Sequence, residues 1–258
     1  MTQGAGRMTG DETQGMKAER RLRARLNRPE LLDLGFGSVD DAAANLAEMW
    51  RINRYLGGFQ ALTRHLYPRL MISPSHMALL DLGTGSADVP VAIARWARKR
   101  RLTLRVFALD WAARNLAAAR GRVTGTPEVT LLRADASRLP LLPESVDFVI
   151  SSLFLHHFSP GQVVELLRAS FALARRGIVM SDLVRGWLPY FAFRLVQPVF
   201  ARHRLTRHDG ALSILRAYLP SELYELAAAA GLPAPEVHTH WPWRMTLVAD
   251  KSPRGTFK

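Results

Sequence analysis

Residues 79–90 have the sequence LLDLGTGSADVP. A short apolar run, residues 77–80, leads into it from a Ser-Pro-Ser turn, as expected for a strand buried on both faces. Gly83 and Gly85 let the backbone turn tightly and leave room for a ligand against the main chain. Asp88 is placed to cap a following helix, with Pro90 in its first turn. The stretch therefore predicts a strand, a glycine turn and a helix, the first unit of an α/β fold that binds its ligand beyond the carboxyl end of the strand.

Two carboxylates, Asp81 and Asp88, flank this turn and indicate the kind of ligand. A dinucleotide fingerprint would have its third glycine at the position of Asp88. The carboxylates would repel a pyrophosphate, but they suit a cation. S-adenosylmethionine carries a sulfonium and an ammonium and has no phosphate. The stretch resembles the first motif of the class I S-adenosylmethionine-dependent methyltransferases; the alternative is the glycine turn of an unrelated α/β protein.

The totals exclude several classes of protein. The chain has 258 residues, enough for one large domain with or without a small cap. It has no cysteine, which excludes disulfides, thiolate catalysis and cysteine-ligated zinc and agrees with a cytoplasmic location. We expect neither a signal peptide nor a membrane span, because the first residues are mostly polar and no apolar run is long enough.

The formal net charge is +13, which is compatible with nucleic acid or an anionic membrane as a partner. Only four of the basic residues are lysines: Lys17, Lys99, Lys251 and Lys258. Such an arginine bias often reflects genome composition, and we favour that explanation over a functional one.

Apolar runs and helical patterns alternate along the rest of the chain. We expect further strands at residues 102–109, 129–133, 146–151 and 177–182, and a closing antiparallel hairpin at residues 236–240 and 243–249. Helices are expected at residues 89–101, 112–120, 162–174 and 221–230. The resemblance implies an α/β fold with a Rossmann-like, mostly parallel seven-stranded sheet, its last strand antiparallel, together with N-terminal helices and an inserted helical cap.

We divide the chain into three parts. Residues 1–30 are expected to form a mobile tail, residues 31–70 an N-terminal helical lid, and residues 71–258 the methyltransferase domain, with a cap inserted at about 183–219. The first helical part is equally compatible with a simple hairpin packed on the domain. If it is a lid, four of its residues lie near the substrate: Trp50, Asn53, Arg54 and Tyr55.

The resemblance covers residues 77–182, because successive strands end in the family's features in the family's order. It implies nine cofactor-binding residues: Asp81, Gly83, Thr84, Gly85, Asp110, Trp111, Asp135, Ala136 and Ser151. In the family, the acid after the second strand holds the ribose and the next side chain lies against the adenine, roles that fall to Asp110 and Trp111. The acid after the third strand, here Asp135, reads the adenine amino group. One departure is Ala87, where many members have glycine; alanine is tolerated unless the position needs a positive φ.

His156 and His157 follow the fourth strand, beside the place to which the methyl group would point. Methyl transfer needs donor and acceptor held in line and, for a hydroxyl acceptor, a group that takes its proton. Histidine has a suitable pKa, and we assign the catalytic role to this pair, with His156 as the first choice of base. A structural or acceptor-orienting role is the alternative.

We expect no metal. Metal-dependent catechol methyltransferases use several carboxylates near the acceptor, whereas residues 151–154 before the histidines contain no acid. Asp182, at the end of the fifth strand, is the nearby acid that remains, and we assign it to the substrate site.

The segment from Leu183 to Arg207 interleaves large apolar residues with arginines. We consider three roles in order of preference: a cap packed over the sheet, a lid for an aromatic or lipid-tailed acceptor, and a basic amphipathic surface that contacts membrane. After it, Asp209, Ser213 and Arg216 share one helix face, which we interpret as a solvated polar stripe before an acceptor-binding one.

The first hypothesis is an enzyme of secondary metabolism that O-methylates a phenol or hydroxyquinone, because the N-terminal helices and the histidine segment look most like small-molecule methyltransferases of the quinone-biosynthesis group. The alternatives are C-methylation of a quinone precursor, RNA methylation and a ligand-binding homologue without activity. We do not expect nucleic acid, because no RNA-binding module and no Asn/Asp-Pro-Pro-aromatic motif is present. The acceptor, the methylated atom and the oligomeric state are not encoded in these motifs.

Overall fold

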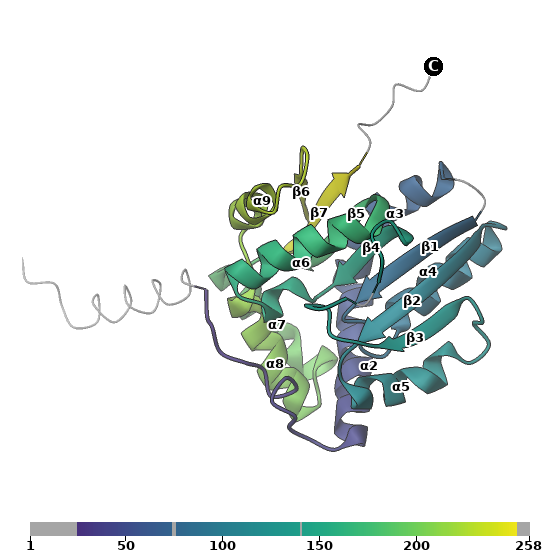
Figure 1. The fold of residues 1–258 in the computed structure, drawn as a ribbon. Coiled ribbons are helices and arrows are strands. Elements are labelled where there is room, and N and C mark those ends of the chain that lie inside the picture. The colour runs from purple at the N-terminus through teal and green to yellow at the C-terminus, as the bar shows by residue number, and fades with distance from the viewer. Residues whose placement is uncertain (1–24, 74–75, 140, 252–258) are drawn as a thin grey trace, which may run out of the picture.

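A computed structural model describes residues 25–73, 76–139 and 141–251 of the chain (Figure 1). The first 24 residues, to which the sequence analysis assigns most of a mobile tail, lie outside the described residues. The remaining part of that segment, residues 25–30, is not a free tail: it packs against the domain, and Glu30 is buried.

The core of the fold is a seven-stranded sheet with the order β3-β2-β1-β4-β5-β7-β6. The strands are β1 (His76–Leu82), β2 (Thr103–Asp110), β3 (Val129–Arg133), β4 (Val146–Ser152), β5 (Ala174–Leu183), β6 (Glu236–His240) and β7 (Arg244–Asp250). β1 to β5 are parallel neighbours, and β7 is antiparallel to both β5 and β6. The predicted fold class is therefore confirmed, including the single antiparallel strand near the end.

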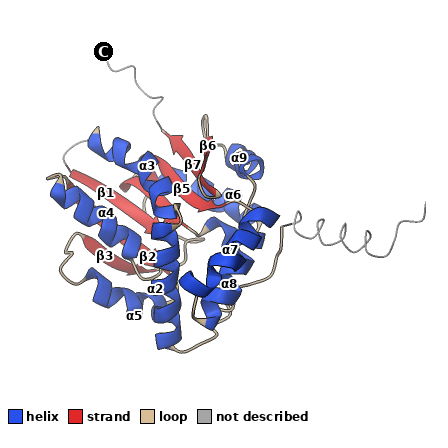
Figure 2. Cartoon of the chain, turned by 180° about the vertical axis from the view of Figure 1, so that it is seen from behind, coloured by secondary structure: helices blue, strands red, loops and turns tan. Residues whose placement is uncertain are grey.

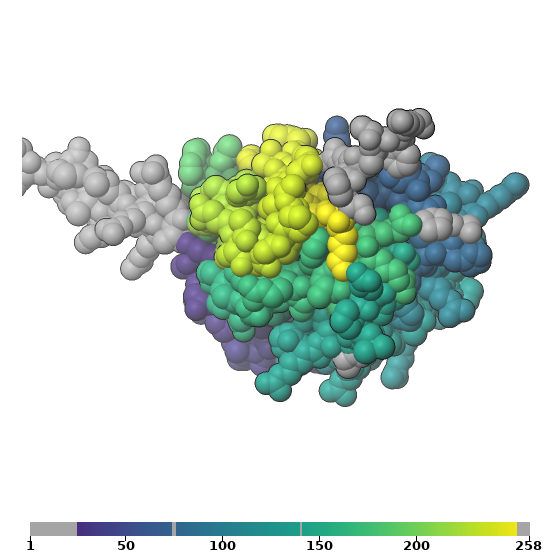
Figure 3. Space-filling model, turned by 45° about the horizontal axis from the view of Figure 1, so that its top comes forward, coloured from purple at the N-terminus to yellow at the C-terminus, as the bar shows by residue number. Residues whose placement is uncertain are grey.

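Helices cover both faces of the sheet. On one face lie α3 (Gly58–Met71), α4 (Asp88–Lys99) and α5 (Ala113–Val123). Figure 2 views the molecule from this side. On the other face lie α6 (Pro160–Leu173) and α9 (Pro220–Ala229). Figure 3 shows the yellow-green part of the chain that contains α9 packed against the green part that contains α6. Strands covered on both sides need apolar side chains on both faces, which explains the continuous apolar runs in β1 and β4.

The turn between β1 and α4 differs from the prediction in one detail. The residue that precedes the helix is Ala87, not Asp88, and Ala87 has a left-handed backbone with φ 59°. Asp88 is the first helical residue, and its carboxylate accepts a hydrogen bond from the Ser86 hydroxyl (2.6 Å). The position at which the resembled family often has glycine thus has a positive φ here, and alanine adopts it under strain.

Three helices close the end of the molecule at which the parallel strands finish: α2 (Val39–Tyr55), α7 (Trp187–Phe200) and α8 (Arg204–Arg216) (Figure 1). They share a small apolar cluster that includes Ile52, Phe193 and Ile214. Gly210 of α8 touches the Phe193 ring so closely that an added Cβ would lie 2.6 Å from it. This close approach places α8 directly against α7.

Among the described residues, we find no helix with the length and apolar character needed to cross a bilayer.

Candidate active site

A cavity of about 630 Å³ opens at the carboxyl ends of the parallel strands. One wall is formed by the glycine turn and by the residues that follow β2 and β3. The opposite wall comes from residues 27–33, from α2, from the short 3₁₀ helix η1 (Leu155–His157) and from α8. The cavity therefore lies where this class of fold binds its ligands.

The glycine turn leaves the cavity wall without side chains. Gly83 and Gly85 have φ values of 68° and 56°, which glycine adopts without strain. A Cβ on Gly83 would lie 2.1 Å from the Phe154 ring, so no other residue fits there. The Thr84 amide donates to the Leu109 carbonyl (2.9 Å) and ties the turn to β2. A ligand can therefore approach the main chain at this point.

Asp110, at the end of β2, holds the turn in place from the other side. Its carboxylate accepts hydrogen bonds from the amides of Gly85 and Ala112, both at 2.9 Å, and from the Asn115 side chain. Burial raises the pKa of Asp110, and these donors oppose the rise. Asp110 lines the cavity next to Trp111, which is mostly exposed.

Asp81 lies beneath the turn and is 2 % exposed, and it does not line the cavity. Burial, and to a lesser degree the charge of Asp110, raise its pKa to about 7, while the Thr84 side chain opposes the rise. The carboxylate is thus poised to ionise near neutral pH. A cation bound above the turn would favour its ionised form.

Replacing Asp81 by asparagine should change how stability depends on pH. The folded protein keeps the Asp81 proton up to about pH 7, whereas an unfolded aspartate loses it near its ordinary pKa of 3.8. Stability should therefore fall as the pH rises from 4 to 7, by up to about 4 kcal/mol. The asparagine amide cannot ionise, so urea unfolding should show the variant gaining on the wild type between pH 5 and pH 8. The exposed Asp135→Asn variant is the control, and equal slopes for wild type and Asp81→Asn would contradict the assignment.

The structure brings together most of the predicted cofactor residues on one cavity wall. Asp135 and Ala136 line it after β3, and Asp135 accepts a hydrogen bond from the Ser137 amide (2.8 Å). Ser151 does not: it is fully buried, and its hydroxyl points to the Met180 sulfur. Its neighbour Ser152 lines the cavity and accepts a hydrogen bond from Asn53 (3.0 Å).

The predicted lid residues divide into two pairs. Trp50 and Asn53 of α2 line the cavity. Arg54 and Tyr55 are exposed and are not among the lining residues; the Arg54 guanidinium lies over the Trp50 ring instead. Only one side of α2 faces the site, which the helical spacing of these four residues requires.

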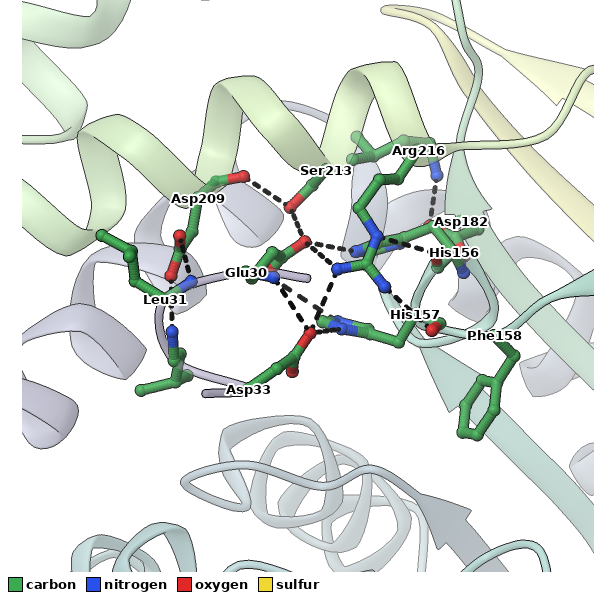
Figure 4. A network of polar contacts seen from close by, with 12 residues as sticks. Glu30, Leu31, Asp33, His156, His157, Phe158, Asp182, Asp209, Ser213 and Arg216 are labelled. Carbon is green, nitrogen blue, oxygen red and sulfur yellow. Dashed lines mark hydrogen bonds and ion pairs between the residues drawn. The ribbon is translucent and has the colours of Figure 1, made fainter. Parts of the chain in front are cut away.

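The two histidines have different surroundings. His156 is 1 % exposed and lies behind the cavity wall, where its Nδ1 is 2.7 Å from Asp182 Oδ1 and its Nε2 is 3.5 Å from Glu30 Oε1 (Figure 4). Burial opposes protonation, but the two carboxylates raise the pKa of His156 to about 9. His156 is therefore a buried imidazolium at neutral pH, and Asp182, equally buried, is its counter-ion and does not line the cavity.

His157 lines the cavity, with 24 % of its side chain exposed. Its Nδ1 lies 3.0 Å from Asp33 Oδ2, and its Nε2 is 4.0 Å from Glu30 Oε2, beyond hydrogen-bonding distance. Although burial favours the neutral acid, hydrogen bonds from His157 and Arg216 hold the pKa of Asp33 well below its usual range. Asp33 thus fixes the Nδ1–H tautomer and leaves Nε2 as the basic nitrogen.

Sequence reasoning missed the contribution of residues 25–33. Asp209 of α8 accepts hydrogen bonds from the amides of Leu31 and Leu32 (2.9 and 3.0 Å) and so anchors this segment. Arg25 donates to the carbonyls of His156 and Phe158. Residues 25–33, called the N-terminal strap below, carry Glu30 and Asp33. No sequence pattern near these two residues predicts where the strap lies.

The polar residues of α8 are not a solvated stripe, and that interpretation is wrong. Asp209, Ser213 and Arg216 are all buried. The Arg216 guanidinium donates to the carbonyls of His156 (3.2 Å) and His157 (2.8 Å) and lies 3.1 Å from Asp33 Oδ2 (Figure 4). The three residues do share one helix face, as their spacing predicts. That face packs against the N-terminal strap and η1, not against solvent.

Glu30, His156 and His157 place one potential metal-ligand atom each within 4.8 Å of the others. Each of the three already has a partner of opposite charge. Asp182 lies at Nδ1 of His156 and Asp33 at Nδ1 of His157, and Arg216 Nη1 lies 3.9 Å from Glu30. We assign no metal to this cluster, because a dication there would lie beside the guanidinium. The absence of a metal remains a prediction.

Comparison with known proteins finds a match for the part of the chain that contains the glycine turn, Asp110 and Asp135. Residues 79–177 match the family model described as a methyltransferase domain. No curated protein matches the chain. The domain match, together with the fold, implies S-adenosylmethionine as the cofactor.

Solved structures share the fold at low sequence identity. A SAM-dependent methyltransferase from Aquifex aeolicus is 14 % identical with a TM-score of 0.56, over 80 % of this chain and 98 % of that one. The CurJ carbon methyltransferase is 12 % identical with a TM-score of 0.56, over 76 % of this chain and 54 % of that one. The CMeT domain of the citrinin polyketide synthase is 15 % identical with a TM-score of 0.55, over 71 % of this chain and 49 % of that one.

Proposed function

We propose that the protein transfers the methyl group of S-adenosylmethionine to the hydroxyl group of a small aromatic acceptor, a phenol or hydroxyquinone. The observation that supports this proposal is that one cavity combines the wall of the glycine turn, Asp110 and Asp135 with the His157–Asp33 pair. When bound, S-adenosylmethionine supplies a methyl carbon activated by a cationic sulfur.

The residues of the first wall fit that cofactor. The bare glycine turn admits a ligand against the backbone, Asp110 offers carboxylate oxygens for ribose hydroxyls, and Trp111 offers a ring face for adenine. Asp81 adds negative charge below the turn when it ionises. Together they favour a nucleoside that carries positive charge and no phosphate.

The opposite wall suits a planar acceptor with an acidic hydroxyl. Trp50, Phe154 and Phe158 supply aromatic surface, and His157 supplies the proton acceptor. As the acceptor oxygen forms its bond to the methyl carbon, its proton passes to His157 Nε2, and Asp33 stabilises the imidazolium that results. His156 is already protonated behind the wall, so we assign the base role to His157 and a structural role to His156.

The test is methyl transfer from labelled S-adenosylmethionine to a panel of phenols and hydroxyquinones, with the product identified by mass spectrometry. We expect methyl ethers, and no product from acceptors whose hydroxyl groups are already methylated. Ring methylation of those capped acceptors would establish C-methylation instead. Methylation of RNA only would exclude a small acceptor, and cofactor binding without any product would indicate a ligand-binding homologue.

A further inference from the structure

Helix α7 has one face in the protein and one in solvent (Figure 2). Pro189, Phe193 and Gln197 repeat every four residues and are buried against α2 and α8. Tyr190, Val196 and Phe200 are partly buried against the same apolar cluster. These six residues form the packed side of the helix, and its other large apolar side chains are exposed.

The free face of α7 is apolar. At 100° per residue its large exposed apolar positions fall on one continuous arc of about 120°. The side chains at these positions are Trp187, Leu188, Phe191, Leu195 and Val199, with Leu195 82 % exposed. Single exposed apolar residues are normal, but a contiguous group of this size marks an interaction surface.

The charged residues of the α7 segment itself have one sign. No aspartate or glutamate occurs from Leu183 to His208, a span that contains five arginines. Arg185 is buried against Glu222, whereas Arg194, Arg202 and Arg204 are exposed. In the described part of the chain, no ion pair or side-chain hydrogen bond holds these three guanidinium groups. The surface therefore offers an apolar centre with an unneutralised basic edge.

We propose that α7 docks this protein on the surface of an anionic lipid bilayer. The helix lies flat, with the apolar arc among the acyl chains and the arginines at the level of the phosphates. Tryptophan and phenylalanine on such a face are typical of the membrane interface. The inference is independent of the reaction, since it needs neither the cavity nor the cofactor.

Charge decides between a bilayer and a second copy of the chain. A symmetric dimer through this face would bring the same basic edge of both protomers together, and the arginines would repel. An anionic bilayer attracts every one of them. The basic edge of this face is therefore more compatible with lipid phosphates than with the same face of a second protomer.

Docking through α7 would turn the cap of the cavity towards the bilayer. α7 packs against Ile52 of α2, and the neighbouring residues Met49 and Asn53 of that helix line the cavity. It also packs against α8, which carries Arg216. An acceptor with a lipid tail would then be presented next to the site.

The experiment is flotation of the full chain with vesicles of phosphatidylglycerol or of phosphatidylcholine at low salt. We expect binding to phosphatidylglycerol, a decrease in that binding at about 0.5 M salt, and little binding to phosphatidylcholine. The double variant Phe191→Asp/Leu195→Asp should reduce the partition coefficient at least tenfold. Leu142→Asp, at an exposed apolar residue outside α7, is the matched control and should leave binding unchanged.

The arginines are tested in the same way. Arg194, Arg202 and Arg204 changed together to glutamine should lower binding to phosphatidylglycerol at least tenfold, while the same change at Arg95, Arg105 and Arg120 should have a clearly smaller effect. Unchanged thermal unfolding shows that each variant is folded. Absence of binding by the wild type, an equal loss in either control, or conversion of a dimer to a monomer by Leu195→Asp without vesicle binding would overturn the proposal.

Discussion

Replacing His156 by alanine is expected to lower the free energy of unfolding by about 3–5 kcal/mol. The substitution leaves Asp182 buried without its counter-ion and removes a second positive charge from beside Glu30. For a chain of this size, a loss of that order lowers the melting temperature by roughly 6–20 °C. Calorimetry or urea unfolding at pH 7 measures it directly.

The raised pKa of His156 also determines how the free energy of unfolding depends on pH. The pKa of His156 is about 9 in the folded protein against an ordinary value of 6.5. A raised pKa means that the stabilisation is fully present below pH 6.5 and is lost as the pH rises through 9. The wild type should therefore lose about 3 kcal/mol between pH 6.5 and pH 10, and His156→Ala should not show this loss.

A neutral pair is the matched control for this prediction. Asp182→Asn together with His156→Gln removes both charges and keeps two groups that can hydrogen-bond. The double variant should be more stable than the sum of the two single changes predicts, because each single change strands a buried charge. If His156→Ala unfolds like the wild type and loses only methyl transfer, His156 is the base and the structural assignment is wrong.

Replacing His157 by alanine should have the opposite profile. We expect the fold and the affinity for S-adenosylhomocysteine to be kept, because His157 is partly exposed and lies on the acceptor side of the cavity. The kcat for a phenol should fall by roughly 10²–10⁴, the usual contribution of a positioned base. Steady-state kinetics with one phenol, beside a thermal unfolding curve, separates the two effects.

Two comparisons show whether the lost group is a base. The decrease should be smallest for the most acidic phenols, which need least help to lose a proton. Asp33→Asn should lower kcat more than it changes KM and should shift the pH profile, since Asp33 acts through His157. A loss in His157→Ala that is the same for every phenol and appears only in KM would contradict a base role.

Local signals were sufficient for most of the fold. The runs that became β1 and β4 are apolar on both faces, and the glycine turn after β1 has a geometry that Gly83 alone satisfies next to Phe154. Order along the chain then fixed the parallel sheet and the closing hairpin. The error of one residue at Ala87 arose because a left-handed alanine carries no sequence signal.

The second wall of the cavity could not be predicted, because it forms between segments that are far apart in the chain. The side chains of Asp33 and Arg216 approach to 3.1 Å in space, yet the two residues lie at opposite ends of the sequence. Charged residues such as Asp209 are usually exposed, and only tertiary partners show that this one is buried. The adjacency of His156 and His157 likewise hides which of them faces the cavity.

Ligand-induced thermal stabilisation tests whether the glycine turn, Asp110 and Trp111 form an S-adenosylmethionine site. S-adenosylhomocysteine at about 100 times its Kd should add roughly 2.7 kcal/mol to the stability of the wild type. NAD at the same concentration should add nothing, because the carboxylates of Asp88 at the cavity wall and of Asp81 beneath the turn disfavour its pyrophosphate. A clear shift with S-adenosylhomocysteine alone is the predicted result; no shift with it, or an equal shift with NAD, would contradict the account.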